Sequence, residues 1–179
     1  LMKLTSAYST FLNGGKLVFP ILIDRVQDSE GNTILNNEIR TCANCDQISF
    51  TGKDYPYIKN NYKQIFSSQT AYQITSLLEG VVKRGTGKKL RDLNLNLAGK
   101  TGTTNKNTDA WFIGFTSNLV IGVYVGMDNP QSLGKFETGS KTALPIFKNF
   151  IIKAIKKSDA RPFKVANGIT MMVIDPSTG

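Results

Sequence analysis

The stretch "LAGKTGTTNKNTDAWFIGFTSNLVIGVYVGM", residues 97–127, decides the fold class of this chain. It predicts three strands, Leu97–Thr103, Ala110–Thr116 and Leu119–Met127, because apolar, aromatic and β-branched residues are frequent in each segment. A polar run separates the first two strands, and Thr116-Ser117-Asn118 turns the second into the third. Short turns of this kind join antiparallel strands. We therefore expect an antiparallel sheet at the centre of the fold.

Helical patterns stand on both sides of these strands in the sequence. Residues 3–15 place apolar side chains at helical spacing and end in a glycine pair. Residues 67–87 form the clearest helix, which a serine can cap and Gly85 can end. Pro145 suits the first turn of a further helix. This order of elements predicts an α+β fold, an antiparallel sheet flanked by helices.

The remaining segments give weaker signals. Residues 17–28 predict a strand that Pro20 makes irregular, and residues 33–36 can pair back with it as a hairpin. Residues 36–64 are polar and irregular, which indicates a surface excursion. The tail, residues 163–179, predicts one more strand and half a hairpin.

Composition and charge narrow the function classes. The chain has 179 residues, 40% of them hydrophobic, and no apolar run of the ~20 residues that a membrane span requires. A formal charge of +9 is compatible with a polyanionic partner. The lysines are scattered, however, and Lys153–Lys157 stands where it complements the dipole of a predicted helix. Since no basic stripe alternates with aromatic residues, we expect no nucleic-acid partner.

The sequence contains no histidine, which excludes histidine-based triads and histidine-ligated metals built from this chain alone. Its two cysteines form Cys42-x-x-Cys45, too few ligands for a structural zinc site. A disulfide in an oxidising compartment and an inert pair in a loop both remain open. We predict no cofactor and no metal.

Three interpretations compete for Lys100-Thr101-Gly102-Thr103. The first is a phosphate-binding loop, since Gly99-Lys100-Thr101 matches the end of that motif, but the motif requires glycine where Asn94 stands and a helix afterwards. The second is a solvated strand edge rich in threonine. The third is an acyl-transfer site on an edge strand.

The acyl-transfer interpretation uses each of the four residues. Lys100 and Gly102 point to one side of an ideal strand, and Thr101 and Thr103 point to the other, although twist at an edge can bring them around one groove. Glycine lets a substrate backbone lie against the strand. An unpaired N–H group of an edge strand can hold an oxyanion, and a lysine with threonine hydroxyls suits a carboxylate.

A resemblance favours this third interpretation. The blocks "TSAYSTFLNGGKLVFPILIDRV", "QTAYQITSLLEGVVKRGTG" and "AGKTGTTNKNTDAWFIGF" resemble the transpeptidase domain of penicillin-binding proteins, most closely the bifunctional class A members. K-T-G is one of the three motifs of these enzymes. The resemblance implies the fold shared with serine β-lactamases, incomplete at the N-terminal side. Residues 1–157 would be the C-terminal part of that domain, and residues 158–179 the start of a C-terminal extension.

The resemblance also implies a chemistry. A serine attacks the D-Ala-D-Ala end of a peptidoglycan stem peptide and forms an acyl-enzyme, which an amine of a second stem peptide resolves; β-lactam antibiotics acylate the same serine. In this family Lys100 would aid charge stabilisation and proton transfer. The hydroxyls of Thr101 and Thr103 would bind the substrate carboxylate, the Thr103 N–H would be one oxyanion donor, and Gly102 would keep the groove open.

The nucleophile of this chemistry is expected outside the chain. Ser132-Leu133-Gly134-Lys135 spells the S-x-x-K motif, but it follows K-T-G and stands in a Pro/Gly-flanked loop, so we reject it; no S-x-N occurs. The chain is therefore expected to need the missing N-terminal part of the same protein and to be inactive alone. The parent would be anchored in the inner membrane with this domain on the periplasmic side. The alternative is a non-catalytic, wall-binding remnant.

Overall fold

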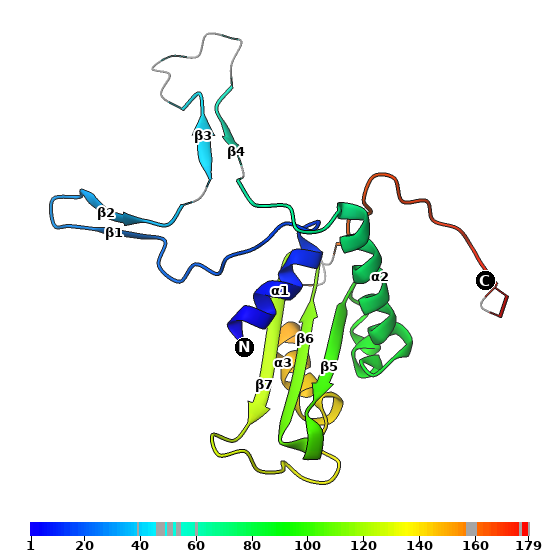
Figure 1. Ribbon diagram of the computed structural model, residues 1–179. Helices are drawn as coiled ribbons and strands as arrows, with labels where there is room; N and C mark the ends of the chain where they lie inside the picture. Colours follow the sequence, from blue (N-terminus) through cyan, green and yellow to red (C-terminus); the bar gives the residue numbers. More distant parts are fainter. Residues whose placement is uncertain are drawn as a thin grey trace.

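A three-stranded antiparallel sheet forms the centre of the molecule (Figure 1). The computed structural model describes residues 1–38, 40–45, 49, 52, 55–59, 61–156, 161–175 and 177–178. The sheet contains β5 (Ala98–Thr103), β6 (Asp109–Phe115) and β7 (Val120–Gly126), in the order β5-β6-β7. Every strand lies within one residue of its predicted bounds, so the antiparallel sheet expected from the sequence is confirmed.

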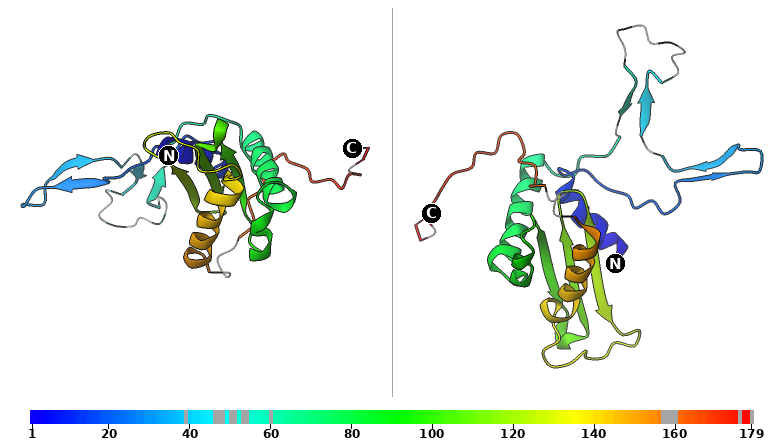
Figure 2. Two further views of the ribbon diagram at one scale, coloured as in Figure 1. Left: turned by 90° about the horizontal axis from the view of Figure 1, so that it is seen from below. Right: turned by 180° about the vertical axis from the view of Figure 1, so that it is seen from behind.

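Helices cover both faces of this sheet. On one face, Phe112 of β6 packs against Phe147 of α3 (Leu144–Ala154), with ring centres 4.8 Å apart. On the other face, Phe115 lies in a cluster with Leu78 of α2 (Ser68–Arg84) and with residues of α1 (Met2–Leu12). In Figure 1, α1 lies in front of the sheet and α3 behind it, and the right view of Figure 2, seen from behind, shows α3 in front. The α+β class with flanking helices is therefore confirmed.

Helix α2 forms where its sequence pattern predicts. The Ser67 hydroxyl caps the helix by accepting a hydrogen bond from the Thr70 N–H at 3.1 Å. Ala71, Leu78 and Val82 are buried along one face, and Gly85 ends the helix. This helix lies beside β5 and therefore determines what surrounds the K-T-G segment (Figure 1).

Three short helical turns were not predicted. Two are 3-10 helices, η1 (Lys88–Leu93) and η2 (Asn105–Asn107), and the third is the π-helical turn η3 (Gly139–Ala143). η3 runs directly into α3, whose first turn contains Pro145, as the sequence predicts.

The described residues between positions 16 and 64 form an arm that projects away from the sheet and contains two hairpins (Figures 1 and 2). The first pairs β1 (Arg25–Gln27) with β2 (Thr33–Asn36), and the second pairs β3 (Thr41–Ala43) with β4 (Tyr57–Lys59). The predicted pairing of residues 33–36 is confirmed, but only three residues of the predicted 17–28 strand adopt strand structure. The second hairpin carries a disulfide between Cys42 and Cys45, whose Cα atoms lie 5.7 Å apart.

The strand predicted in the tail is wrong for the residues that the structure describes. Residues 161–175 contain no strand. Phe163 is buried instead and packs edge-on against Phe115 at 5.6 Å, and the Gln69 side chain donates a hydrogen bond to the Asn167 carbonyl at 2.8 Å. Side chains therefore fix the segment to β6 and α2, and Met171–Ile174 beyond it are exposed. No helix in the described part of the chain is long and apolar enough to cross a membrane.

Candidate active site

The Lys100–Thr103 segment lies on β5, at the edge of the sheet. β5 pairs with β6 along its whole length, from Ala98 opposite Phe115 to Thr103 opposite Ala110, and within the described residues no strand pairs with its other side. Because this edge leaves backbone N–H and C=O groups unpaired, an extended peptide can add to it. The segment therefore has the geometry that the acyl-transfer interpretation requires.

The strand also excludes the phosphate-loop interpretation. Gly99, Lys100 and Thr101 are all part of β5. The next element is the three-residue η2, followed by β6, so no helix N-terminus follows the motif to bind a phosphate.

Side chains alternate across β5 as predicted. Lys100 stands opposite Ile113 and Gly102 opposite Trp111, on the sheet face that α1 and α2 cover in part. Thr101 stands opposite Phe112, and Thr103 opposite Ala110, on the face that α3 covers. Lys100 is exposed, and its ammonium group donates a hydrogen bond to the Thr101 carbonyl at 2.8 Å. No acidic side chain in the described part of the chain forms a salt bridge with it.

The Thr103 hydroxyl is held by the start of η3. Its oxygen accepts a hydrogen bond from the Gly139 N–H at 3.0 Å. The hydroxyl proton is not used in this bond, so it stays available to an incoming acceptor. A side chain at Gly139 would place its Cβ less than 3.0 Å from the backbone oxygens of Gly102 and Trp111, which explains why glycine occupies this position.

The Thr101 hydroxyl has an unexpected partner, the hydroxyl of Thr86. The two oxygens lie 2.8 Å apart, across the gap between the turn that follows α2 and strand β5. Sequence reasoning interpreted Gly85-Thr86-Gly87 only as a tight turn that ends a helix. Nothing in the sequence indicates the contact, because Thr86 and Thr101 are brought together by the packing of α2 beside β5.

Gly102 has a packing role in addition to the one predicted from the resemblance. A Cβ atom at Gly102 would lie 3.1 Å from the Cβ of Trp111, which is a tight contact. The next nearest atom also belongs to the Trp111 side chain. The Trp111 ring in turn packs on Tyr124, with ring centres 4.6 Å apart. The absence of a side chain at Gly102 therefore lets Trp111 lie close to β5.

Asp109 orients the connection between β5 and β6. Its carboxylate accepts hydrogen bonds from the hydroxyls of Tyr124 at 2.8 Å, Thr104 at 3.1 Å and Thr108 at 3.3 Å. The bond from Tyr124, and then those from the threonines, hold the pKa of Asp109 below its ordinary value. The sequence-based interpretation of Asp109 as a residue that orients this turn, rather than a catalytic one, agrees with these contacts.

Ser132 and Lys135 do not form a catalytic pair at a helix start. Both lie in the connection between β7 and η3, where the Ser132 hydroxyl accepts a hydrogen bond from the Gly134 N–H at 3.2 Å. The Asn107 side chain fixes this connection by donating to the carbonyls of Gly134 and Lys135. The site thus consists of an ammonium group, two oriented hydroxyls and an open strand edge.

Comparison with known proteins adds family evidence to this geometry. Residues 1–151 match the model of the penicillin binding protein transpeptidase domain. The chain is 41% identical over its whole length to penicillin-binding protein 1A of Rickettsia prowazekii and 32% identical over 99% of its length to that of Pseudomonas aeruginosa. It spans 23% and 25% of those two proteins.

A solved structure agrees with the sequence relatives. Penicillin-binding protein 1A from Haemophilus influenzae superposes with a TM-score of 0.79 at 27% identity, over 97% of this chain and 29% of that one. The family match includes β5 and the K-T-G segment, on which the sequence resemblance rests. The chain belongs to the penicillin-binding protein transpeptidase domain family.

Proposed function

We propose that this chain supplies the K-T-G wall of the active site of a peptidoglycan D,D-transpeptidase. The observation that carries the proposal is the position of Lys100–Thr103 on an edge strand with one unpaired side. Within this segment, hydrogen bonds already orient the hydroxyl groups of Thr101 and Thr103. A stem peptide that ends in D-Ala-D-Ala would lie along this edge, with its carboxylate at the hydroxyls of Thr101 and Thr103.

The proposed chemistry is acyl transfer through a nucleophilic serine, which this chain does not supply. The serine oxygen attacks the carbonyl carbon of the penultimate D-alanine, the terminal D-alanine leaves with a proton, and an amine of a second stem peptide then takes the acyl group. The Thr103 N–H is one donor to the oxyanion, and the ammonium group of Lys100 stabilises charge and takes part in proton transfer. A β-lactam ring is opened by the same serine.

The nucleophile and the base come, in this proposal, from an N-terminal part of the same protein. The relatives from Rickettsia prowazekii and Pseudomonas aeruginosa, each about four times as long as this chain, support this arrangement. Residues 1–157 would then complete the transpeptidase domain, and residues 158–179 would begin a C-terminal extension. The Cys42–Cys45 disulfide fits a location on the periplasmic side of the inner membrane. No cofactor takes part.

The experiment is acylation of the intact protein by a labelled penicillin. Lys100→Ala should slow acylation by about 10²-fold or more, the size of losing an acid–base or oxyanion-stabilising group. Lys88→Ala is the matched control, because Lys88 is an exposed lysine of η1 outside β5. Acylation at the wild-type rate by a folded Lys100→Ala protein would contradict the assignment. An intact protein that penicillin does not acylate at all would support the non-catalytic, wall-binding alternative.

A further inference from the structure

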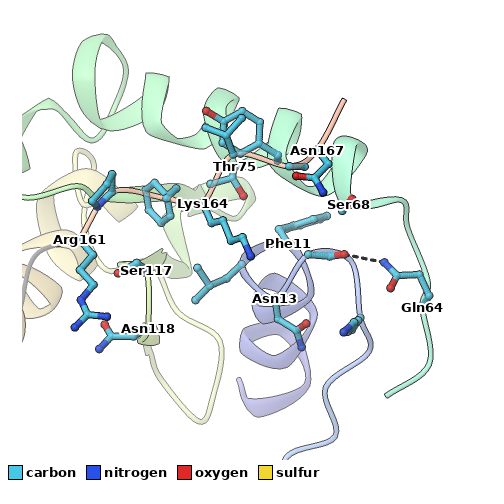
Figure 3. Close-up of a pocket in the computed structure, with 18 residues that line it drawn as sticks. Phe11, Asn13, Gln64, Ser68, Thr75, Ser117, Asn118, Arg161, Lys164 and Asn167 are labelled. Atoms are coloured by element: carbon cyan, nitrogen blue, oxygen red, sulfur yellow. Dashed lines mark hydrogen bonds between the residues drawn. The ribbon is translucent and has the colours of Figure 1, made fainter. Parts of the chain in front are cut away.

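A second concave site lies at the end of the sheet that contains the β6–β7 turn, which is the opposite end from Thr103. It is a cavity of about 790 Å³ between the end of α1, the first turns of α2, the β6–β7 turn and the C-terminal segment 161–167 (Figure 3). Phe163, anchored against Phe115, holds the C-terminal segment in place as one wall. The cavity is therefore built by packed elements, and its size is that of sites that bind small ligands.

The charges around this cavity all have one sign. Three cations line it, Lys16, Arg161 and Lys164, and none of the described residues that line it is acidic. None of the three forms a salt bridge with a described acidic group. Figure 3 shows Lys164 extended from the C-terminal segment toward the end of α1, and Arg161 extended toward Asn118. Helix α2 begins here without an acidic residue in its first turn, so its dipole adds to the positive potential.

The other lining groups are amides and aromatic rings. Asn13, Gln64 and Asn118 offer side-chain amides, each of which can both donate and accept hydrogen bonds. Gln64 also closes one side of the cavity by donating to the Gly14 carbonyl at 2.7 Å (Figure 3). Phe11 and Tyr72 add apolar ring surface. Such a lining matches a ligand that combines a ring with hydroxyl or amide groups and a negative charge.

We propose that this cavity binds an acidic saccharide, with its carboxylate between Lys164 and Arg161 and its sugar ring against the aromatic side chains. The preference for an anion follows from the charges alone, whereas the choice of a saccharide rests on the proposed function, because a muramic acid residue of the glycan strand has a free carboxylate wherever it carries no stem peptide. The site would hold such a peptide-free stretch of the strand, while a stem peptide from another part of the strand lies at the K-T-G segment.

The test is a calorimetric titration of the intact protein after treatment with penicillin, so that the transpeptidase site is already acylated. The probe is the disaccharide of N-acetylglucosamine and N-acetylmuramic acid without its peptide, and the neutral comparison is di-N-acetylchitobiose. We expect the acidic disaccharide to bind about tenfold or more tightly than the neutral one, because charge-assisted hydrogen bonds form only with the former. Equal affinities, or no binding of either sugar, would overturn the proposal.

Variants locate the binding in the cavity. Arg161→Gln combined with Lys164→Gln should weaken binding of the acidic disaccharide by about tenfold or more. Lys153→Gln with Lys156→Gln is the control, since it removes the same charge from an exposed region at the end of α3. Unchanged affinity in the cavity variant would overturn the proposal. This holds even if the melting temperature of the variant falls, because the two cations would then have only a structural role. Inorganic phosphate that binds as tightly as the disaccharide would overturn the saccharide assignment.

Failure of this inference can be told from failure of the proposed function. If penicillin does not acylate the protein, the transpeptidase assignment is wrong, and the titration still reports on the cavity. If acylation is normal and the disaccharide does not bind, only the cavity assignment is wrong.

Discussion

At the scale of single residues, the site depends on how two hydroxyl groups are held. Thr103 is fixed by a backbone N–H, that of Gly139, whereas Thr101 is fixed by another side chain, that of Thr86. The second contact is the easier of the two to remove without disturbing the backbone. It therefore offers a direct test of whether orientation of the Thr101 hydroxyl affects the reaction.

Thr86→Val should slow acylation of the intact protein by penicillin about fivefold, the effect of one lost hydrogen bond of roughly 1 kcal/mol. Valine keeps the shape of threonine but removes the hydroxyl that meets Thr101. Thr86→Ser, which keeps the hydroxyl, should restore most of the rate. The measurement is the second-order acylation rate constant at equal melting temperature. Equal rates for the valine and serine variants would show that the contact has no role in the site.

At the scale of elements, η3 connects the α3 side of the sheet to the site strand. Gly139 lies so close to the backbones of β5 and β6 that a side chain has no room there. Gly80 in α2 is the opposite case, because a Cβ there would contact only the side chain of Arg84. The two glycines allow a comparison of the same substitution in different surroundings.

Gly139→Ala should destabilise the protein by about 1–3 kcal/mol, since the backbone atoms that its Cβ would meet cannot move aside independently. It should also slow acylation, because moving η3 away from β5 breaks the hydrogen bond to Thr103. Gly80→Ala, the control, should raise stability by about 0.5–1 kcal/mol, as alanine favours a helix interior over glycine. Denaturant unfolding measures both changes. A fully stable Gly139→Ala protein would contradict the close packing of η3.

The β5–β6 connection should weaken in acid. The hydrogen bonds from Tyr124, Thr104 and Thr108 lower the pKa of Asp109, so the folded state binds this proton less readily than the unfolded chain does. The contribution of Asp109 is present above its unfolded pKa and is lost as the pH falls through its folded pKa. Between about pH 5 and pH 3, wild type should therefore lose more stability than Asp109→Asn. Parallel loss in thermal melts of both proteins would remove Asp109 from the acid response.

The sequence predicted the elements better than their contacts. The three strands of the central sheet and α2 were found within one residue because alternation, β-branched residues, a capping serine and a terminal glycine are local signals. The π-helical turn η3 was missed, since it depends on the approach of Gly139 to two strands distant in sequence. The prediction of a strand in the tail was wrong, because an apolar run of sequence does not show whether a partner strand lies beside it.

For the candidate site, too, the sequence predicted the strand but not the contacts between distant residues. Lys100 and its neighbours were placed correctly on a strand, because K-T-G and its flanking apolar residues are contiguous. The partners of the hydroxyls could not be predicted, since Thr86 and Gly139 come from the end of α2 and the start of η3. The cavity between α1, α2 and the C-terminal segment was missed for the same reason.

At the scale of the whole molecule, the three-stranded sheet has an unpaired edge at β7 as well as at β5 among the described residues. The chain also exposes large apolar side chains at the start of α1, namely those of Met2, Leu4 and the N-cap residue Leu1. In the proposed enzyme, the preceding part of the protein covers this region and brings the nucleophile.

The isolated chain should form no covalent adduct with a β-lactam. The donors around β5 can stabilise an oxyanion only if a nucleophile attacks, and Ser132, in the connection between β7 and η3, is in the wrong place to do so. Intact-mass spectrometry after incubation with penicillin provides the measurement, with the full-length protein as the positive control. A stoichiometric adduct on a serine of this chain that disappears when the chain is denatured first would refute both the rejection of Ser132 and the need for a second part.

The π-helical turn has one further consequence, which concerns insertions and deletions. In η3 the Leu144 N–H donates to the Gly139 carbonyl five residues earlier, so the turn holds one residue more than an α-helical turn. Deleting one residue here would let the turn close as an α-helix while Phe147 and Ile151 keep α3 in its place. Because each residue advances a helix by about 100°, Gly139 would then rotate away from Thr103. The rotational position of Gly139 relative to Thr103 is thus set by the number of residues in η3.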